Sequence, residues 1–232
     1  MNALPKPYYK DDFVTIYHGD CREIVPLLGK FDLLLTDPPY GICRDGSKRS
    51  TSKHGGRKAY DFMGWDTAAP IAEISAAMQI SDQHVVWGAN YFPSALPPSM
   101  GWLVWDKGQD ICSSDCELAY SSRDGALRRI VLNRVELMKD GAQHPTQKPL
   151  ALITWCLSFF PDAQTVLDPF AGSGTTGRAC KDTGRKCTLI EREERYCEIA
   201  AKKMRQEVLL PVAAVAPLKE RELFETPAEP LA

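Results

Sequence analysis

Two short strings of residues have types and spacings that could do chemistry. The first is Asp37-Pro38-Pro39-Tyr40, and the second is D-P-F-A-G-S-G-T-T-G at 168–177. Each follows an apolar run, 31–36 or 165–168, that is typical of a buried strand. Ligands of open α/β sheets bind at the carboxyl ends of strands. The pair therefore suits a nucleotide-like cofactor beside a planar ring that stacks on an aromatic side chain.

The first string could hold an exocyclic amine. Its two prolines fix φ and remove two amide donors, so the carbonyls of the turn remain free acceptors, and Asp37 adds a carboxylate. Tyr40 could stack on the ring that bears the amine. Acceptors for both N–H groups favour the pyramidal nitrogen that is needed for attack on a methyl group. The alternative is a Pro-Pro turn that only ends a strand.

The second string predicts a cofactor loop. Gly172, Gly174 and Gly177 fit G-x-G-x-x-G, and Glu191 closes the next strand, where it could accept hydrogen bonds from ribose hydroxyls. No lysine follows as a phosphate-binding P-loop requires. Asp168 would repel a phosphate but suits the ammonium and sulfonium of S-adenosylmethionine. Each carboxylate has an alternative role. Asp168 could merely cap the loop, and Glu191 could be an ordinary surface carboxylate.

The elements that position both strings alternate between apolar runs and helix-like segments from Phe13 to Ala200, which is typical of a mainly parallel α/β sheet. The predicted strands are Phe13–His18, Phe31–Thr36, His84–Trp87, Trp102–Trp105, Thr165–Asp168 and Lys186–Ile190. The predicted helices are 68–80, 147–160, 174–183 and 193–208. Their expected signals are Thr67 and Thr146 as N-caps, Pro149 in a first turn, and Gly184 just past a C-terminus.

Length and composition limit the possibilities. The chain has 232 residues, which predicts one α/β domain over 1–210, and the Pro-, Ala- and Glu-rich 211–232 segment is expected to be disordered. A net charge of −2 argues against binding a polyanion with the whole surface. Cys112 and Cys116 lack a second ligand pair, so no metal is expected. The absence of a secretory signal or an apolar span predicts a cytoplasmic protein with reduced thiols and no membrane partner.

With both strings in view, the chain resembles the S-adenosylmethionine-dependent DNA amino-methyltransferases that modify adenine N6 or cytosine N4. The order is that of the permuted, beta-type members, in which the catalytic corner precedes the cofactor loop. The string H-P-T-Q-K-P at 144–149 adds to the resemblance, which covers about 13–205. It implies a Rossmann-like, doubly wound sheet in circularly permuted order. Residues 165–205 would supply the first two βα units and 13–106 the units that normally follow.

The resemblance also implies residue roles. Asp37, Pro38, Pro39 and Tyr40 would form the catalytic corner. The implied cofactor ligands are Asp168, Phe170, Gly172, Ser173, Gly174, Thr175, Glu191, Asp20, His144, Thr146 and Lys148. In this family the 144–149 string lines the methionine end of the cofactor, and the aspartate of H-G-D-C at 18–21 approaches its adenine. Two alternatives stay open, because Asp20 with Glu23 also fits a helix-capping pair and His144 fits an ordinary loop histidine.

The implied function is site-specific methylation of adenine N6 in double-stranded DNA, on a flipped-out base, in a restriction–modification setting. Residues 41–66 are expected to be a mobile loop, and its basic residues would track DNA phosphates. These are Arg44, Lys48, Arg49, Lys53, Arg57 and Lys58. A solvated charged linker is the alternative. About 108–143 would be a short target-recognition region, which indicates a brief recognition sequence and leaves room for a homodimer.

Four other functions remain open at this point. Cytosine N4 methylation shares the geometry, although the family's cytosine members more often carry serine where Asp37 stands. An RNA adenine methyltransferase would use the same residues. A cofactor-binding DNA regulator without turnover is the non-enzymatic alternative, and the intact catalytic corner argues against it. A dinucleotide oxidoreductase would explain the glycines alone.

Overall fold

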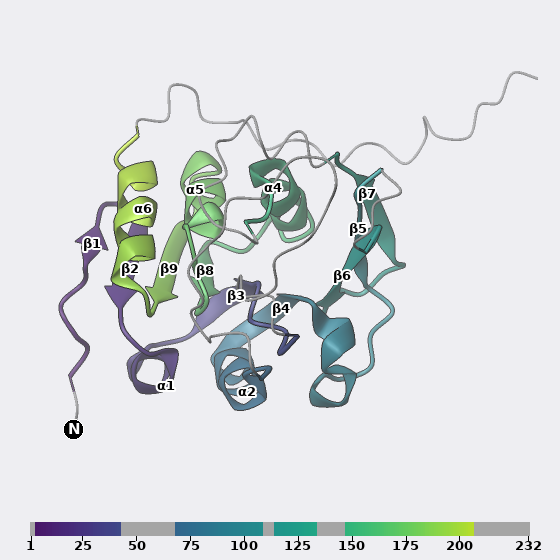
Figure 1. Ribbon diagram of the computed structural model, residues 1–232, viewed down its shortest axis with the longest axis horizontal. Coiled ribbons are helices and arrows are strands. Elements are labelled where there is room, and N and C mark those ends of the chain that lie inside the picture. Colours follow the sequence, from purple (N-terminus) through teal and green to yellow (C-terminus); the bar gives the residue numbers. More distant parts are fainter. Residues whose placement is uncertain (1–2, 43–67, 109–113, 134–146, 207–232) are drawn as a thin grey trace, which may run out of the picture.

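The computed structural model describes residues 3–42, 68–108, 114–133 and 147–206, and their strands form one nine-stranded sheet with helices on both faces (Figure 1). The strands are β1 (Tyr9–Lys10), β2 (Val14–His18), β3 (Phe31–Thr36), β4 (Ser81–Trp87), β5 (Leu103–Asp106), β6 (Cys116–Ser121), β7 (Arg128–Val131), β8 (Thr165–Asp168) and β9 (Lys186–Glu191). The α-helices are α1 (Cys21–Ile24), α2 (Ile71–Gln79), α4 (Leu150–Ser158), α5 (Thr175–Asp182) and α6 (Glu194–Met204). The 3-10 turns are η1 (Val25–Leu27), η2 (Ala89–Tyr91) and η3 (Pro93–Ala95).

The sheet is mainly parallel and doubly wound, as the sequence predicts. Its strand order is β1-β2-β9-β8-β3-β4-β6-β5-β7, and the five strands from β2 to β4 in this order are parallel. Helices α4, α5 and α6 cover one face, whereas α1 and α2 cover the other (Figure 1). From β8 the chain passes through α5 to β9, and from β3 through α2 to β4, on opposite faces and in opposite directions. The carboxyl ends of β3 and β8 are therefore a topological switch point, where such sheets bind ligands.

The core explains why the parallel strands look uniformly apolar in sequence. On β3, Leu33 and Leu35 pack with Val166 and the helices α4 to α6, while Leu34 packs on the other face with Leu167 and Ile74 of α2. Successive side chains of a strand point to opposite faces, so a strand that is covered on both sides needs apolar residues throughout. No helix in the described ranges is long and apolar enough to span a bilayer.

Most predicted strand boundaries agree with the structure to within one residue, but two of the predicted helices begin later than expected. Phe31–Thr36 and Thr165–Asp168 are confirmed as strands, whereas β4 begins earlier, at Ser81. The helices expected at 68–80 and 147–160 begin at Ile71 and Leu150, and in each the N-cap is a proline, Pro70 or Pro149. Pro149 therefore precedes the first turn instead of lying in it. Thr67 and Thr146, the expected caps, lie outside the described residues.

Two other local predictions have clear outcomes. Gly184 has φ +72°, and its N–H bonds Lys181 O, so the predicted end of α5 is confirmed. The segment about 108–143, expected to recognise DNA, contains β6 and β7, which the sequence did not predict. Strand β6 lies between β4 and β5, antiparallel to both, and is therefore part of the sheet. Residues 109–113, 134–143 and the expected tail at 211–232 lie outside the described residues.

Helix α5 packs closely against the sheet because Gly177 has no side chain. A Cβ on Gly177 would lie 2.7 Å from Leu189 Cδ1. We expect Gly177→Ala to lower the free energy of unfolding by about 1–3 kcal/mol, because the extra methyl overpacks this contact. Gly29→Ala is the control: nothing lies within 4 Å of its Cβ position, and we expect a change within about 0.5 kcal/mol. Urea unfolding of both variants tests this, and equal stabilities would contradict it.

Candidate active site

The two chemical strings meet at the switch point of the sheet. Strands β3 and β8 pair in parallel, with Leu33 opposite Val166 and Leu34 opposite Leu167. At their carboxyl ends the Thr36 hydroxyl donates a 2.7 Å hydrogen bond to Asp168 Oδ1, and both residues are buried. The residue before Asp37 is thus bonded to the residue that begins the glycine loop.

The catalytic corner is held by hydrogen bonds to both oxygens of Asp37. The Tyr40 hydroxyl donates to Asp37 Oδ1 at 2.6 Å, and Lys148 Nζ donates to Asp37 Oδ2 at 2.6 Å. Lys148 also donates to the Tyr40 hydroxyl at 3.1 Å. Asp37 keeps 23% of its side-chain surface exposed, so a ligand can still reach it.

The ring of Tyr40 lies in a position that only glycine permits. It stacks on Tyr91 of η2, with ring centroids 5.0 Å apart and planes 17° from parallel. Gly88, at the end of β4, has φ +69°, and a Cβ there would lie 2.0 Å from Tyr40 Cε1. Gly88 therefore supplies both the left-handed backbone and the space that the ring occupies.

Burial changes the acid–base properties of this corner. Burial raises the pKa of Asp37, and the ammonium of Lys148 opposes that increase. Burial followed by the charge of Asp37 raises the pKa of Tyr40 well above its usual value, so the phenol stays protonated. Burial alone would lower the pKa of Lys148, but Asp37 and Glu117 outweigh it and raise this pKa well above the usual value. Lys148 is therefore an ammonium group that faces two carboxylates.

The charged chain extends beyond the residues that the sequence indicated. Glu117 of β6 lies 3.1 Å from Lys148 Nζ and 2.9 Å from Lys107 Nζ. Lys107 also donates to Ser114 O at 2.8 Å. Burial would raise the pKa of Glu117, but the two lysines lower it to about 2. The available signals were an acidic residue within the apolar string C-E-L-A-Y and a lysine directly after W-D.

The glycine loop has the backbone that its sequence predicts. Gly172 and Gly174 have φ +50° and +80°, and Gly174 is the N-cap of α5. A Cβ on Gly174 would lie 2.7 Å from Ala200 Cβ on α6. At the end of β9, Glu191 accepts hydrogen bonds from Gly172 N and Glu193 N, both at 2.8 Å. Burial raises the pKa of Glu191, and these two N–H groups oppose it.

Further contacts tie the loop to its neighbours. Ser173 is buried and donates to Gln147 Oε1 at 2.8 Å, while Lys203 of α6 donates to Ser173 Oγ at 3.0 Å. Gln147 belongs to the 144–149 string, so the described end of that string contacts the loop. Phe170 donates its N–H to Asp168 at 3.1 Å, and Thr175 begins α5.

The other predicted cofactor ligands have different positions. Asp20 caps α1 by accepting from Arg22 N at 2.9 Å, and it forms an ion pair with the Arg22 guanidinium at 2.6 Å. Next to it, Gly19 N donates to Glu191 O at 3.0 Å, which places Asp20 near the carboxyl end of β9. Lys148 contacts the catalytic corner. His144, Thr146 and the six basic residues of 44–58 lie outside the described residues.

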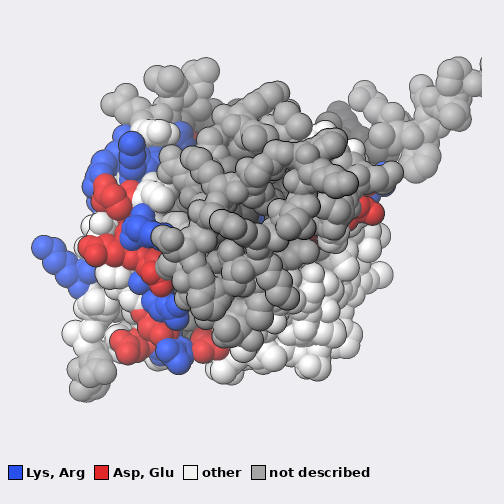
Figure 2. Space-filling view, viewed as in Figure 1, with Lys and Arg blue, Asp and Glu red and all other residues white. Residues whose placement is uncertain are grey.

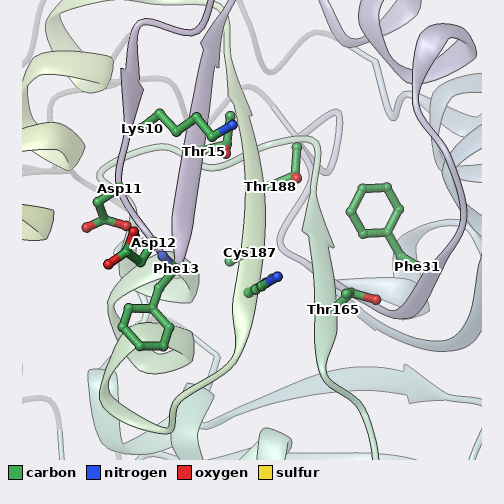
Figure 3. A pocket seen from close by; sticks show the side chains of 10 residues that line it. Lys10, Asp11, Asp12, Phe13, Thr15, Phe31, Thr165, Cys187 and Thr188 are labelled. Atoms are coloured by element: carbon green, nitrogen blue, oxygen red, sulfur yellow. Dashed lines mark hydrogen bonds between the residues drawn. The ribbon is translucent and has the colours of Figure 1, made fainter.

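One cavity in the described residues lies where the parallel strands begin, at the end of the sheet away from the candidate site (Figure 3). It has a volume of about 300 Å³ and is lined at the starts of β2, β3, β8 and β9. Asp11, Asp12 and Phe13 lie on one side of it, and Phe31 and Thr165 lie on the other. Because parallel strands carry their active sites at the carboxyl ends, this cavity is separate from the candidate site.

The charges on the described surface are mixed. Figure 2 shows acidic and basic side chains interspersed along the flank on the left of the view. This flank does not present a field of one sign. It therefore lacks the basic stripe that is typical of a surface that binds nucleic acid by charge alone.

Comparisons with known proteins agree on one family. A family model described as DNA methylase matches residues 96–202. The type II methyltransferase M.HinfI of Haemophilus influenzae is 45% identical over 252 aligned positions, which cover 84% of this chain and 70% of that protein. The solved M1.HpyAVI–SAM complex matches with a TM-score of 0.55 and 23% identity over 83% of this chain and 100% of that one. The PvuII DNA methyltransferase, described as cytosine-N4-specific, has a TM-score of 0.61 and 15% identity over 89% and 91% of the two chains.

The buried Asp168 predicts a pH-dependent stability. Burial raises its pKa to about 6, opposed by the hydroxyls of Thr176 and Thr36. A carboxyl group whose pKa is higher in the folded state stabilises the fold when protonated, and this contribution is lost as pH rises through about 6. Relative to Asp168→Asn, the wild type should therefore lose about 1 kcal/mol of unfolding free energy between pH 5 and 7.5. Urea unfolding of both proteins at the two pH values measures this, and a constant difference would contradict it.

Proposed function

Because this chain belongs to the family of N6- and N4-specific DNA methylases, we propose that it methylates adenine N6 in double-stranded DNA with S-adenosylmethionine as the methyl donor. The observation that carries the proposal is the junction at the switch point. There the amine-binding corner and the cofactor loop are joined by the hydrogen bond from Thr36 to Asp168. The two halves of a methyl transfer thus face each other at the ends of adjacent strands.

The loop suits S-adenosylmethionine better than a phosphate-bearing cofactor. Asp168 is a buried carboxylate directly before the loop, where it would attract a cation and repel a phosphate. Glu191 already accepts two backbone N–H groups, and each carboxylate oxygen has two lone pairs, so it can also accept ribose hydroxyls. When bound, the cofactor supplies an electrophilic methyl group. The proposed ligands are Asp168, Phe170, Gly172, Ser173, Gly174, Thr175 and Glu191, with Asp20 toward the adenine.

The corner suits an aromatic amine. Asp37 has acceptor capacity beyond its bonds to Tyr40 and Lys148, since each oxygen can accept twice. Pro38 and Pro39 carry no N–H, so the local carbonyls also remain acceptors. Tyr40 would stack on a base that has left the duplex. Hydrogen bonds from the amine to these acceptors would hold its nitrogen pyramidal, with its lone pair available for attack on the methyl group.

Adenine is preferred over cytosine because of the residue at the head of the corner. Cytosine N4 methylation would use the same geometry, but the resemblance described above associates serine at this position more often with cytosine. The basic segment 44–58 is proposed to contact DNA phosphates, part of 108–143 is proposed to read the target sequence, and a homodimer is the proposed assembly.

The main test of this function separates chemistry from cofactor binding. Asp37→Ala should leave S-adenosylmethionine affinity nearly unchanged and lower single-turnover methylation by at least about 100-fold, the scale for loss of one preorganised polar group. Calorimetry measures the affinity, and rapid quench on mixed-sequence DNA measures the rate. Asp82→Ala, which removes an exposed carboxylate on β4, is the matched control. Full activity in Asp37→Ala would refute the mechanism.

The same assay tests the stacking and the target base. Tyr40→Ala should lose about 1–3 kcal/mol of base stacking, whereas Tyr40→Phe and Tyr40→Trp keep an aromatic face and should retain much of the activity. Digestion of the product followed by mass spectrometry identifies the base. Methylated cytosine would overturn the choice of adenine but not the mechanism.

A separate test concerns the cofactor. If Glu191 accepts the ribose hydroxyls, Glu191→Ala should weaken S-adenosylmethionine binding by about 1.5–3 kcal/mol, the range for hydrogen bonds to charged groups. Titration calorimetry measures this. A thermal melt of each protein accompanies it, because Glu191 also bonds Gly172 and Glu193. Unchanged affinity in a folded variant would remove Glu191 from the cofactor site.

A further inference from the structure

Lys148 lies between two carboxylates in the interior of the site. Only 6% of its side chain is exposed, and its ammonium is within 5.6 Å of the Tyr40 ring centroid and 5.7 Å of the Trp87 ring centroid. Its partners are Asp37 Oδ2 at 2.6 Å, the Tyr40 hydroxyl at 3.1 Å and Glu117 Oε2 at 3.1 Å. The contacts with Asp37 and Tyr40 are hydrogen bonds, whereas the contact with Glu117 is an ion pair.

Glu117 is the second carboxylate in contact with that ammonium, and it lies outside both chemical strings. It belongs to β6, which is antiparallel to β4, the strand that leads to Gly88 and the space for Tyr40. Lys107, at the end of β5, holds its other oxygen at 2.9 Å and is 5% exposed. The charges alternate as Lys107, Glu117, Lys148 and Asp37, with two buried cations and two partly exposed anions, so the group carries no net charge.

This arrangement affects how strongly Asp37 can accept a hydrogen bond. An ammonium with one carboxylate partner would neutralise that carboxylate in a medium where charges interact strongly. A second carboxylate in contact with the ammonium adds a negative potential at Asp37, which opposes the positive potential of Lys148. Asp37 then keeps more of its negative charge for another donor, and Lys148 is held at a fixed distance from it.

We propose that Glu117 is a positioning residue for methyl transfer, which holds Lys148 between two carboxylates so that Asp37 remains an effective acceptor for the amine of the target base. Lys107 has the supporting role of orienting Glu117. The inference rests on the proposed function, because the amine is that of the extruded base. It goes further by assigning a role to a strand residue that does not belong to either chemical string.

The direct variant is Glu117→Gln, which keeps the shape and an acceptor but removes the charge. It leaves two buried ammonium groups against one carboxylate and therefore destabilises the fold. The double variant Lys107→Met/Glu117→Gln avoids this problem, because it removes one cation and one anion together. Glu198→Gln is the matched control, since it removes the charge of an exposed glutamate whose partners are Arg205 and the Tyr8 hydroxyl.

The double variant should bind S-adenosylmethionine within about threefold of the wild type and transfer methyl groups at least about tenfold more slowly, the lower end of the loss when an orienting partner is removed. Single turnover at saturating cofactor measures the rate per folded molecule. Glu198→Gln should match the wild type in both measurements. A wild-type transfer rate in the double variant would overturn the inference while leaving the proposed function intact.

The pH profile separates positioning from a merely structural role. The groups that face Asp37 in the described residues are Tyr40, Lys148, Glu117 and, across β8, Asp168. Glu117 raises the pKa of Asp37 through its charge. In the double variant the pKa of Asp37 should therefore be lower. The acidic limb of the profile of methyl-transfer rate against pH should move to lower pH, and the maximal rate at the plateau should fall. A lower plateau with an unmoved limb would indicate only a structural role and overturn the inference.

A second readout does not depend on turnover. The Lys148 ammonium can be followed by ¹⁵N NMR, with its signal assigned from Lys148→Arg. The signal should shift between the wild type and the double variant but not in Glu198→Gln, because one of its carboxylate partners has been replaced. An unchanged Lys148 signal would overturn the inference even if the DNA assay failed. Absence of methylation by the wild type, together with the shifted signal, would overturn the proposed function and keep the coupling of Glu117 to the catalytic corner.

Discussion

The site depends on one hydrogen bond across two parallel strands, from the Thr36 hydroxyl to the carboxylate of Asp168. It joins the end of β3 to the end of β8, and each strand continues directly into one half of the site. The bond also has a cost, because a buried carboxylate is stable only with partners. Thr36, Thr176 and the N–H of Phe170 supply these partners, yet the pKa of Asp168 remains near 6. The site thus keeps a carboxylate in a position where it favours a cationic ligand at neutral pH.

Buried charge also shapes the other half of the site. Apolar replacement of buried ion pairs is often neutral or stabilising, so the Lys107–Glu117–Lys148–Asp37 chain is weak evidence for stability. Its contact with Asp37 fits the proposed function, in which Asp37 accepts the amine of the target base. The backbone beside this chain also makes room for the corner. Gly88 has a left-handed conformation and no side chain, which leaves the space in which Tyr40 lies and bonds Asp37.

Sequence reasoning predicted the parts of the site that local rules determine. A buried parallel strand is a continuous apolar run, so β3 and β8 were located by their composition, and the residues after each strand followed from the rule for α/β sheets. Glycines 172 and 174 were recognisable because their backbone conformations exclude most other residues. Strands β6 and β7 were missed because they carry charged residues, such as Glu117 and Arg129, that break the apolar pattern. The resemblance placed Lys148 among the cofactor ligands, and its contacts with Asp37 and Tyr40 were not predicted because they depend on tertiary structure, which no local spacing encodes.

The order of the strings in the chain has little effect on the site, and the topology explains why. The corner follows β3 and the loop follows β8, so the corner comes first in sequence although both occupy the centre of one sheet. The pairs β3–β4 and β8–β9 each join consecutive units, whereas β3 and β8 pair although they lie far apart in the chain. A break between units therefore preserves the pairing of β3 with β8 and the bond from Thr36 to Asp168. The proposed site therefore needs the adjacency of these two strand ends, which the hydrogen bond from Thr36 to Asp168 joins.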